Sequence, residues 1–177
     1  LNRFTLYLSF GGLFLAVLYP FTKRFTFMPQ LFLGAAFSWA VPMAFAAELG
    51  EVPPIAWLIY LTNLVWTVAY DTQYAMVDRE DDLKIGIKST AILFGEADKL
   101  IIGLLQAMTL LGLFLLGDQL SFGWPWLLGL TVAGGLFLYQ QWLIRDRGRD
   151  ACFQAFLNNQ WVGLAVFAGL VFHYLLA

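Results

Sequence analysis

The chain has 177 residues, of which 60% are hydrophobic, 18% aromatic and only 12% charged. Soluble domains carry roughly 25% charged residues, so this composition excludes an ordinary soluble protein and predicts an integral membrane protein. The formal net charge of −2 argues against a nucleic-acid partner, and the single cysteine, Cys152, excludes an intrachain disulfide.

Six stretches without charged residues are long enough to cross a bilayer as helices, which takes about 20 apolar residues. They are too long and too uniformly apolar for barrel strands, and a helix satisfies its own backbone hydrogen bonds in lipid. The sequence therefore predicts an all-α integral membrane domain, with residues 1–177 forming a single domain. In chain order the expected spans are Phe4–Thr22, Gln30–Ala47, Val52–Tyr70, Leu100–Gly117, Leu120–Ile144 and Ala151–Ala177.

Some residues within these spans predict packing rather than chemistry. Pro42 predicts a kink in the second span, because proline removes a helical hydrogen bond. Ala165 and Gly169 form a small-x-x-x-small pair, which favours close helix packing. His173 is interpreted as a satisfied histidine near the outer end of the last span, and Cys152 as a small buried hydrophobic residue.

The basic residues fall on alternate loops. The loops after the first, third and fifth spans contain nine of the ten lysines and arginines, whereas the loops between them contain Glu48, Glu51 and Asp118. The positive-inside rule places the basic loops, including 145–150, in the cytoplasm, so both ends of the chain face outward. The chain starts at Leu1 without a signal-peptide pattern. We therefore expect a fragment, with an odd number of spans missing upstream.

Five carboxylates follow the third span within the twelve residues from Asp71 to Asp82. Carboxylates are costly in a membrane, at about 2.5–3.5 kcal/mol at its centre and less near its surface. At about 100° per residue, Asp71, Asp78 and Asp82 fall within about 40° of one another on a helix. Mg²⁺ takes one or two protein carboxylates and completes its shell with water and phosphate oxygens. The spacing of Asp78 and Asp82 therefore suits a magnesium–diphosphate complex.

Basic residues accompany this acidic segment on the same membrane side. Lys84 and Lys88 follow it directly, and Lys23 and Arg24 lie in the first loop. Lysine and arginine bind phosphate oxygens, although in a loop they also act as plain topology anchors. Acids for a metal and bases for phosphate on one membrane face predict a phosphorylated substrate with a hydrophobic body.

Two motifs resemble those of a known family. The segment from Asp71 to Thr90, with Tyr-Ala-Met-Val-Asp at 74–78 and Gly-Ile-Lys-Ser-Thr at 86–90, resembles the second aspartate-rich signature of the UbiA-type prenyltransferase superfamily. It is most similar to the 4-hydroxybenzoate polyprenyltransferase branch of ubiquinone synthesis. Tyr19-Pro-Phe-Thr-Lys23-Arg24 resembles the family's Tyr-x-x-x-Lys element. The family has nine transmembrane helices, and the six spans resemble helices four to nine.

The resemblance implies transfer of a polyprenyl group from its diphosphate to the ring carbon ortho to the hydroxyl of 4-hydroxybenzoate, with Mg²⁺ as cofactor. It implies an active site on the cytoplasmic side of a bacterial inner membrane and no obligate protein partner. The family's first aspartate-rich motif has no match here, so the fragment alone is expected to be inactive. The expected roles are acceptor activation by Asp71, metal binding by Asp78, Asp82 and Asp81, and diphosphate binding by Tyr19, Lys23, Arg24, Tyr74, Lys84 and Lys88.

Three alternatives remain at this point. An ion-coupled transporter also needs intramembrane acids, but it places them near mid-membrane rather than among bases at one end. A non-catalytic remnant would keep the fold without the missing motif. Another branch of the family would use a different acceptor. The sequence alone does not choose the prenyl chain length or the residues that line a prenyl groove.

Overall fold

The computed structural model describes residues 2–176, which form helices and short connections and contain no strand. Two single 3₁₀ turns, Gly95–Ala97 and Ile144–Asp146, join neighbouring helices. The helices are α1 Arg3–Thr22, α2 Pro29–Ser38, α3 Ala40–Leu49, α4 Pro54–Ile85, α5 Thr90–Phe94, α6 Asp98–Gln119, α7 Trp124–Leu143 and α8 Arg149–Leu176. The all-α fold class predicted from the sequence is confirmed.

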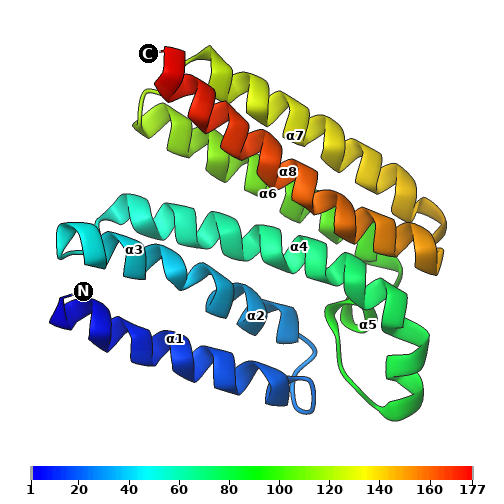
Figure 1. Cartoon of the computed structure of the whole chain (residues 1–177). Coiled ribbons are helices and arrows are strands. Elements are labelled where there is room, and N and C mark those ends of the chain that lie inside the picture. Colours follow the sequence, from blue (N-terminus) through cyan, green and yellow to red (C-terminus); the bar gives the residue numbers. More distant parts are fainter. Residues whose placement is uncertain (1, 177) are drawn as a thin grey trace.

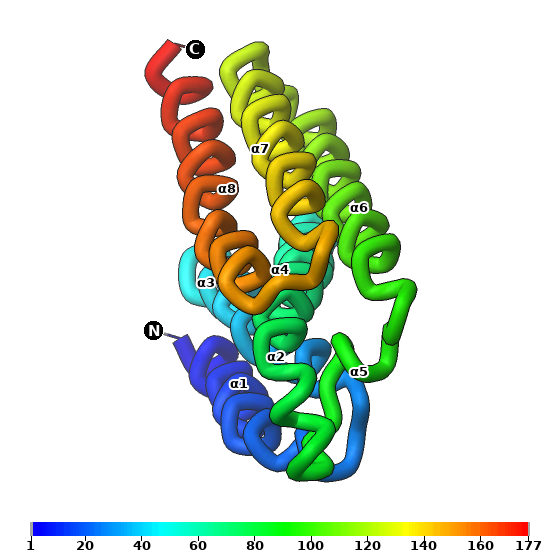
Figure 2. The backbone as a smooth tube through the Cα atoms, turned by 90° about the vertical axis from the view of Figure 1, so that its right-hand side faces the viewer, coloured from blue at the N-terminus to red at the C-terminus, as the bar shows by residue number. Residues whose placement is uncertain are grey.

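The long helices run up and down through one bundle. In Figure 1 the α1–α2 loop, the α4–α5 region and the α7–α8 loop lie at the right-hand end, whereas both termini lie at the left-hand end. Figure 2 shows α1 to α3 on one side of α4 and α6 to α8 on the other. The three loops that contain nine of the ten basic residues therefore gather at one end of the molecule.

Within the described residues, five helical segments are long and apolar enough to cross a membrane: Arg3–Thr22, Pro29–Leu49, Thr90–Gln119, Trp124–Asp146 and Arg149–Leu176. The sixth expected span, Val52–Tyr70, forms the first half of α4 in the same bundle. This helix also carries buried polar residues, among them Thr62, Thr67 and Gln73, which lower its hydropathy. The count of six spans therefore stays a prediction.

Helix α4 is the central element and continues well past the predicted span. It starts at Pro54, directly after Pro53, and ends at Ile85, before Gly86, whose φ of 73° favours glycine. It packs against α2, α3, α6 and α8. Because α4 is unbroken from Pro54 to Ile85, the acidic segment is a direct extension of a packed helix.

The kink predicted in the second span takes the form of a break between α2 and α3. Pro42 has no N–H to bond the carbonyl of Ser38, and the chain bends at Trp39, between them. The Trp39 indole nitrogen donates to the Leu8 carbonyl of α1 at 2.7 Å. Its ring lies so close to Gly11 and Gly12 that a Cβ at either position would come within 3.0 Å of it.

Two sequence predictions concern the last helix pair. The expected span Leu120–Ile144 starts too early: Ser121 adopts a φ of 55° in a turn, and α7 begins only at Trp124. The close packing predicted from Ala165 and Gly169 is confirmed, because an added Cβ on Gly129 of α7 would lie 2.7 Å from the Ala165 carbonyl and 3.1 Å from the Gly169 Cα.

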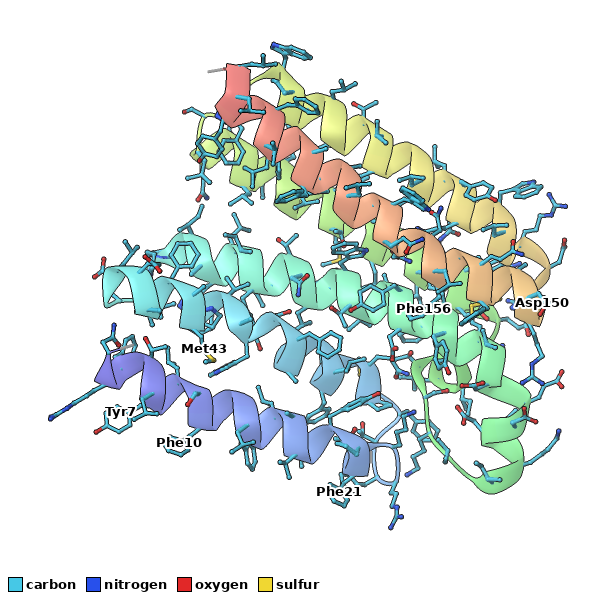
Figure 3. All side chains as sticks on the ribbon, viewed as in Figure 1. Tyr7, Phe10, Phe21, Met43, Asp150 and Phe156 are labelled. Carbon is cyan, nitrogen blue, oxygen red and sulfur yellow. The ribbon has the colours of Figure 1, made fainter. Side chains whose placement is uncertain are left out.

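The outer surface of the bundle is apolar, as a lipid-facing surface must be. Tyr7, Phe10 and Phe21 of α1 point away from the neighbouring helices (Figure 3) and are 53–68% exposed. Only Thr5 and Thr22 of α1 are buried, so α1 packs on one side alone.

Candidate functional site

The predicted acid stripe exists on one side of α4. Because the helix is continuous, Asp71, Asp78 and Asp82 project from it within about 40° of one another. All three carboxylates are partly buried rather than fully solvated. The one-sided arrangement inferred from the spacing is therefore supported by the helix geometry.

The C-terminal end of α1 lies against this stripe. The Lys23 ammonium is close enough to interact electrostatically with both Asp71 and Asp82. The Tyr19 phenol lies near Asp71 and Tyr74 in the same way. The fold thus brings the Tyr-x-x-x-Lys element at 19–23 face to face with acids that lie far later in the chain.

The C-terminal part of the stripe brings the carboxylates of Asp78 and Asp82 close to each other. Burial raises the pKa of the Asp82 carboxyl, Lys23 opposes this rise, and the charges of Asp78 and Asp81 add to it. A cation between Asp78 and Asp82 would relieve that repulsion. Among residues 2–176, no three His, Cys, Asp or Glu side chains come together as a metal site. Two carboxylates with phosphate oxygens are nevertheless a usual environment for Mg²⁺.

Asp81 lies off the stripe, about 100° around the helix from Asp82. Its carboxylate pairs with Arg149 of α8 at 2.8 Å and with Lys84 at 3.1 Å. Hydrogen bonds from Arg149 and Lys84 hold the pKa of the exposed Asp81 carboxyl below its usual range. Two of the residues predicted to bind ligands, Asp81 and Lys84, therefore already neutralise each other in this structure.

Lys88 links the loop after α4 to the loop after α1. Its backbone N–H donates to the Lys23 carbonyl at 3.1 Å, and its ammonium lies 5.1 Å from the centre of the Phe27 ring and 3.5 Å from the Phe25 carbonyl. Arg24 is exposed beside this junction. The two sequence motifs are therefore hydrogen-bonded to each other through their loops.

An aromatic cleft lies deeper in the bundle, between α2, α4 and α8. Its volume is about 570 Å³, and it reaches Tyr70 and Phe156, one turn from Tyr74. The Tyr74 ring centre is 5.1 Å from that of Phe156, which lies between α8 and α4 (Figure 3). The cleft is lined by Phe37, Asn63, Trp66, Tyr70, Phe156, Leu157, Asn159 and Gln160.

The structure also joins residues that the sequence analysis did not single out. Gln140 of α7 lies at the centre of a buried amide network: its oxygen accepts from Gln73 at 3.0 Å and from Gln106 at 2.8 Å, and its nitrogen donates to Asn158 at 3.0 Å. Asn159 extends the network to Gln73. The sequence signal for this network was the presence of several Gln and Asn residues within apolar spans, because a buried amide needs a hydrogen-bond partner.

A buried ion pair holds the same end of the bundle together. Asp98, which is fully buried at the start of α6, binds Arg147 through two hydrogen bonds of 2.9 Å and Arg79 at 3.3 Å. The loop 145–150, which we interpreted as a topology loop, therefore also anchors α4 and α6. Arg79 is part of the acidic segment, so this cluster fixes the helix that bears Asp78 and Asp82.

His173 and Cys152, which we interpreted as structural residues from the sequence, have structural surroundings. His173 accepts a hydrogen bond from the Gly123 N–H at 3.2 Å and packs on Phe122, with 4.8 Å between the ring centres. Cys152 is fully buried. Cys152 packs in the core cluster that contains Ala75 and Met76 of α4.

Comparisons with known proteins agree on one family. The sequence profile of the UbiA prenyltransferase family matches residues 1–172. The chain is 68% identical over 174 residues to a 4-hydroxybenzoate octaprenyltransferase of Alcanivorax borkumensis, covering 98% of this chain and 60% of that protein. It is 62% identical over 171 residues to the protein of the same name from Colwellia psychrerythraea, with 97% and 60% covered. The chain thus spans about three-fifths of the length of these curated relatives.

Solved structures show the same fold. The apo structure of a UbiA homolog from Aeropyrum pernix superposes with a TM-score of 0.81 at 24% identity, covering 97% of this chain and 64% of that one. A structure described as digeranylgeranylglyceryl phosphate synthase gives a TM-score of 0.72 at 17% identity, with 95% and 62% covered. At these identities the likeness concerns the fold alone.

Proposed function

The chain belongs to the UbiA prenyltransferase family, and from this premise we propose that it is the larger part of a Mg²⁺-dependent 4-hydroxybenzoate polyprenyltransferase of ubiquinone biosynthesis. The proposed substrates are a polyprenyl diphosphate and 4-hydroxybenzoate. The names of the relatives support the reaction and the acceptor. We propose that residues 1–177 form a single domain, which spans about three-fifths of the length of the curated relatives.

The observation that carries this proposal is the pairing of α1 with the acid stripe of α4. Lys23 lies next to Asp71 and Asp82, so a cationic side chain for phosphate and carboxylates for a metal share one end of the bundle. That end also gathers the basic loops, which favours the cytoplasmic side of a bacterial inner membrane. A transporter would instead place its acids near mid-membrane.

Asp78 and Asp82 are the residues of this chain that would hold the metal. Bound Mg²⁺ supplies charge neutralisation for the diphosphate leaving group. The side chains proposed to bind diphosphate oxygens are Lys23 and Arg24, together with Tyr19, Lys84 and Lys88. Tyr74 lies near Tyr19 and packs on Phe156, and its proposed role is to face the prenyl carbon as positive charge develops there.

In the reaction the allylic C–O bond of the prenyl diphosphate breaks, and diphosphate leaves with the bonding electrons. A C–C bond forms to the ring carbon ortho to the phenol hydroxyl, and that carbon then loses its proton to the released diphosphate or to water, which restores the aromatic ring. Asp71, which lies deeper on the stripe than Asp78, orients the acceptor hydroxyl or removes its proton. The aromatic cleft below Tyr74 is the proposed start of the groove for the prenyl tail.

The test uses the full-length enzyme with labelled polyprenyl diphosphate and 4-hydroxybenzoate. Asp78→Asn is expected to abolish transfer or to weaken its Mg²⁺ dependence sharply, because it removes a proposed ligand. Asp81→Asn is the matched control, and its effect should be smaller because Asp81 is already paired with Arg149 and Lys84. Residues 1–177 by themselves are expected to be inactive.

Three outcomes would contradict the proposal. Unchanged kinetics of Asp78→Asn would refute its role as a ligand. Transfer to a different aromatic acceptor, with none to 4-hydroxybenzoate, would assign the enzyme to another branch. Proton- or sodium-coupled solute flux without prenyl transfer would support the transporter.

A further inference from the structure

Gln30, the second residue of α2, is buried at the junction of three helices and is only 3% exposed. Its Oε1 atom accepts a hydrogen bond from the backbone N–H of Thr90, with 3.1 Å between the two atoms. A backbone N–H can only donate, so this contact fixes which end of the amide is the oxygen. The Nε2 end is therefore the end of the amide that is left to donate, and the Asp71 carboxylate lies near the Gln30 side chain.

Thr90 is itself held on α4. Its hydroxyl lies 2.7 Å from that of Thr72, and the Thr72 hydroxyl also lies 2.6 Å from the Val68 carbonyl, to which it donates. Thr72 and Thr90 are both fully buried. The amide of Gln30 is thus locked by a fixed backbone group, beside the α4 residue that directly follows Asp71. Its donor end cannot turn away without breaking the bond to Thr90.

We propose that Gln30 is the positioning residue for Asp71, holding one carboxylate oxygen so that the other faces the hydroxyl of the aromatic acceptor. This inference rests on the proposed function. An amide orients a carboxylate without adding a charge, so Asp71 keeps the ability to take a proton from a phenol. The charged and titratable neighbours of Asp71 are Tyr19 at the end of α1, Lys23 directly after it and Tyr70 on α4.

The competing explanation is that Gln30 only ties α5 to α2 through Thr90. The two explanations differ in which end of the amide matters. Gln30→Glu keeps the oxygen that accepts from Thr90 but replaces the donor toward Asp71 with a second carboxylate oxygen. Thr72→Val removes the hydroxyl pair at the same α4–α5 junction but leaves both ends of Gln30 in place.

The experiment measures kcat and both KM values of the full-length enzyme at pH 8, with labelled polyprenyl diphosphate and 4-hydroxybenzoate. Gln30→Glu should lower kcat by about 10- to 100-fold, the range expected for a lost hydrogen bond to a charged group. The KM for polyprenyl diphosphate should stay within about twofold, since the diphosphate side chains are untouched. Thr72→Val should keep kcat within about threefold.

A double substitution makes the inference sharper. In the Asp71→Asn variant, the amide introduced at position 71 can donate to the carboxylate introduced at position 30. Adding Gln30→Glu to that variant should therefore lower kcat by less than about threefold. An equal loss in both backgrounds, an unchanged kcat for Gln30→Glu, or an equal loss for Thr72→Val would each overturn the positioning role. An unsubstituted enzyme that does not prenylate 4-hydroxybenzoate would overturn the proposed function as well, whereas the other outcomes concern Gln30 alone.

Discussion

Asp98→Asn should destabilise the protein strongly, because Asp98 is the buried centre of the cluster that anchors the C-terminal part of α4. Its carboxylate is fully buried and accepts from Arg147 at 2.9 Å, from Arg79 at 3.3 Å and from the backbone N–H of Lys99 at 2.6 Å. Asparagine keeps the shape but removes the charge. One of its two terminal atoms then becomes a donor that faces a guanidinium.

The size of the stability loss depends on how well water compensates the two arginines that lose their carboxylate partner. Removing one partner of a buried ion pair costs about 3–5 kcal/mol. The Arg79 and Arg147 side chains are 25% and 27% exposed, so water compensates part of their charge and the lower end of that range applies. We expect a loss of about 3 kcal/mol. For a protein of roughly 150–250 residues, this loss lowers the melting temperature by roughly 6–12 °C.

The assay is unfolding of the full-length enzyme in mild detergent, followed by tryptophan fluorescence. Asp146→Asn is the matched control: its pair with Arg145 has a similar distance of 3.0 Å, but the two side chains are 80% and 56% exposed. Such an exposed pair contributes about 0–1 kcal/mol. A loss in unfolding free energy below about 1 kcal/mol for Asp98→Asn, or one no larger than that for Asp146→Asn, would refute the anchoring role of Asp98.

Two further predictions concern packing within the bundle, both measured in the same unfolding assay. Gln140→Leu should lower the free energy of unfolding by about 1–3 kcal/mol, because Gln73, Gln106 and Asn158 lose a buried partner. Thr131→Val, which removes an exposed hydroxyl, is the control, and an equal loss of stability in both variants would contradict this prediction. Gly129→Ala should also cost about 1–3 kcal/mol, since its Cβ would lie 2.7 Å from the Ala165 carbonyl. Gly135→Ala, where nothing lies within 4 Å, should be neutral or stabilising, and equal effects at the two glycines would contradict the packing argument.

The helices could be predicted from the sequence because a span needs about 20 apolar residues and carries its charges only at its ends. Their boundaries were harder to predict where the connection is apolar. The turn at 120–123 has no charged residue, so the sequence could not separate it from α7. The structure shows the turn through the φ of Ser121 and through the start of α7 at Trp124. The break at Trp39 had a local signal in Pro42, and its place was predictable within a turn.

The acid stripe was predictable because helical periodicity is a local property. Asp71, Asp78 and Asp82 share a face of α4 whatever surrounds that helix. The family motifs at 19–24 and 71–90 were equally readable, since they are contiguous in the chain.

The sequence by itself therefore determined the membrane class, the grouping of the basic loops and the composition of the acid stripe. Only the tertiary structure decided which groups have partners: Asp81 is bound by Arg149, 68 residues away, and Gln30 lies between Thr90 and Asp71. The physical reason is that a hydrogen bond or ion pair acts over about 3 Å, so its partner depends on which helices pack together. Helix packing brings Lys23 to the stripe and Arg147 to Asp98, and no spacing along the chain encodes those contacts.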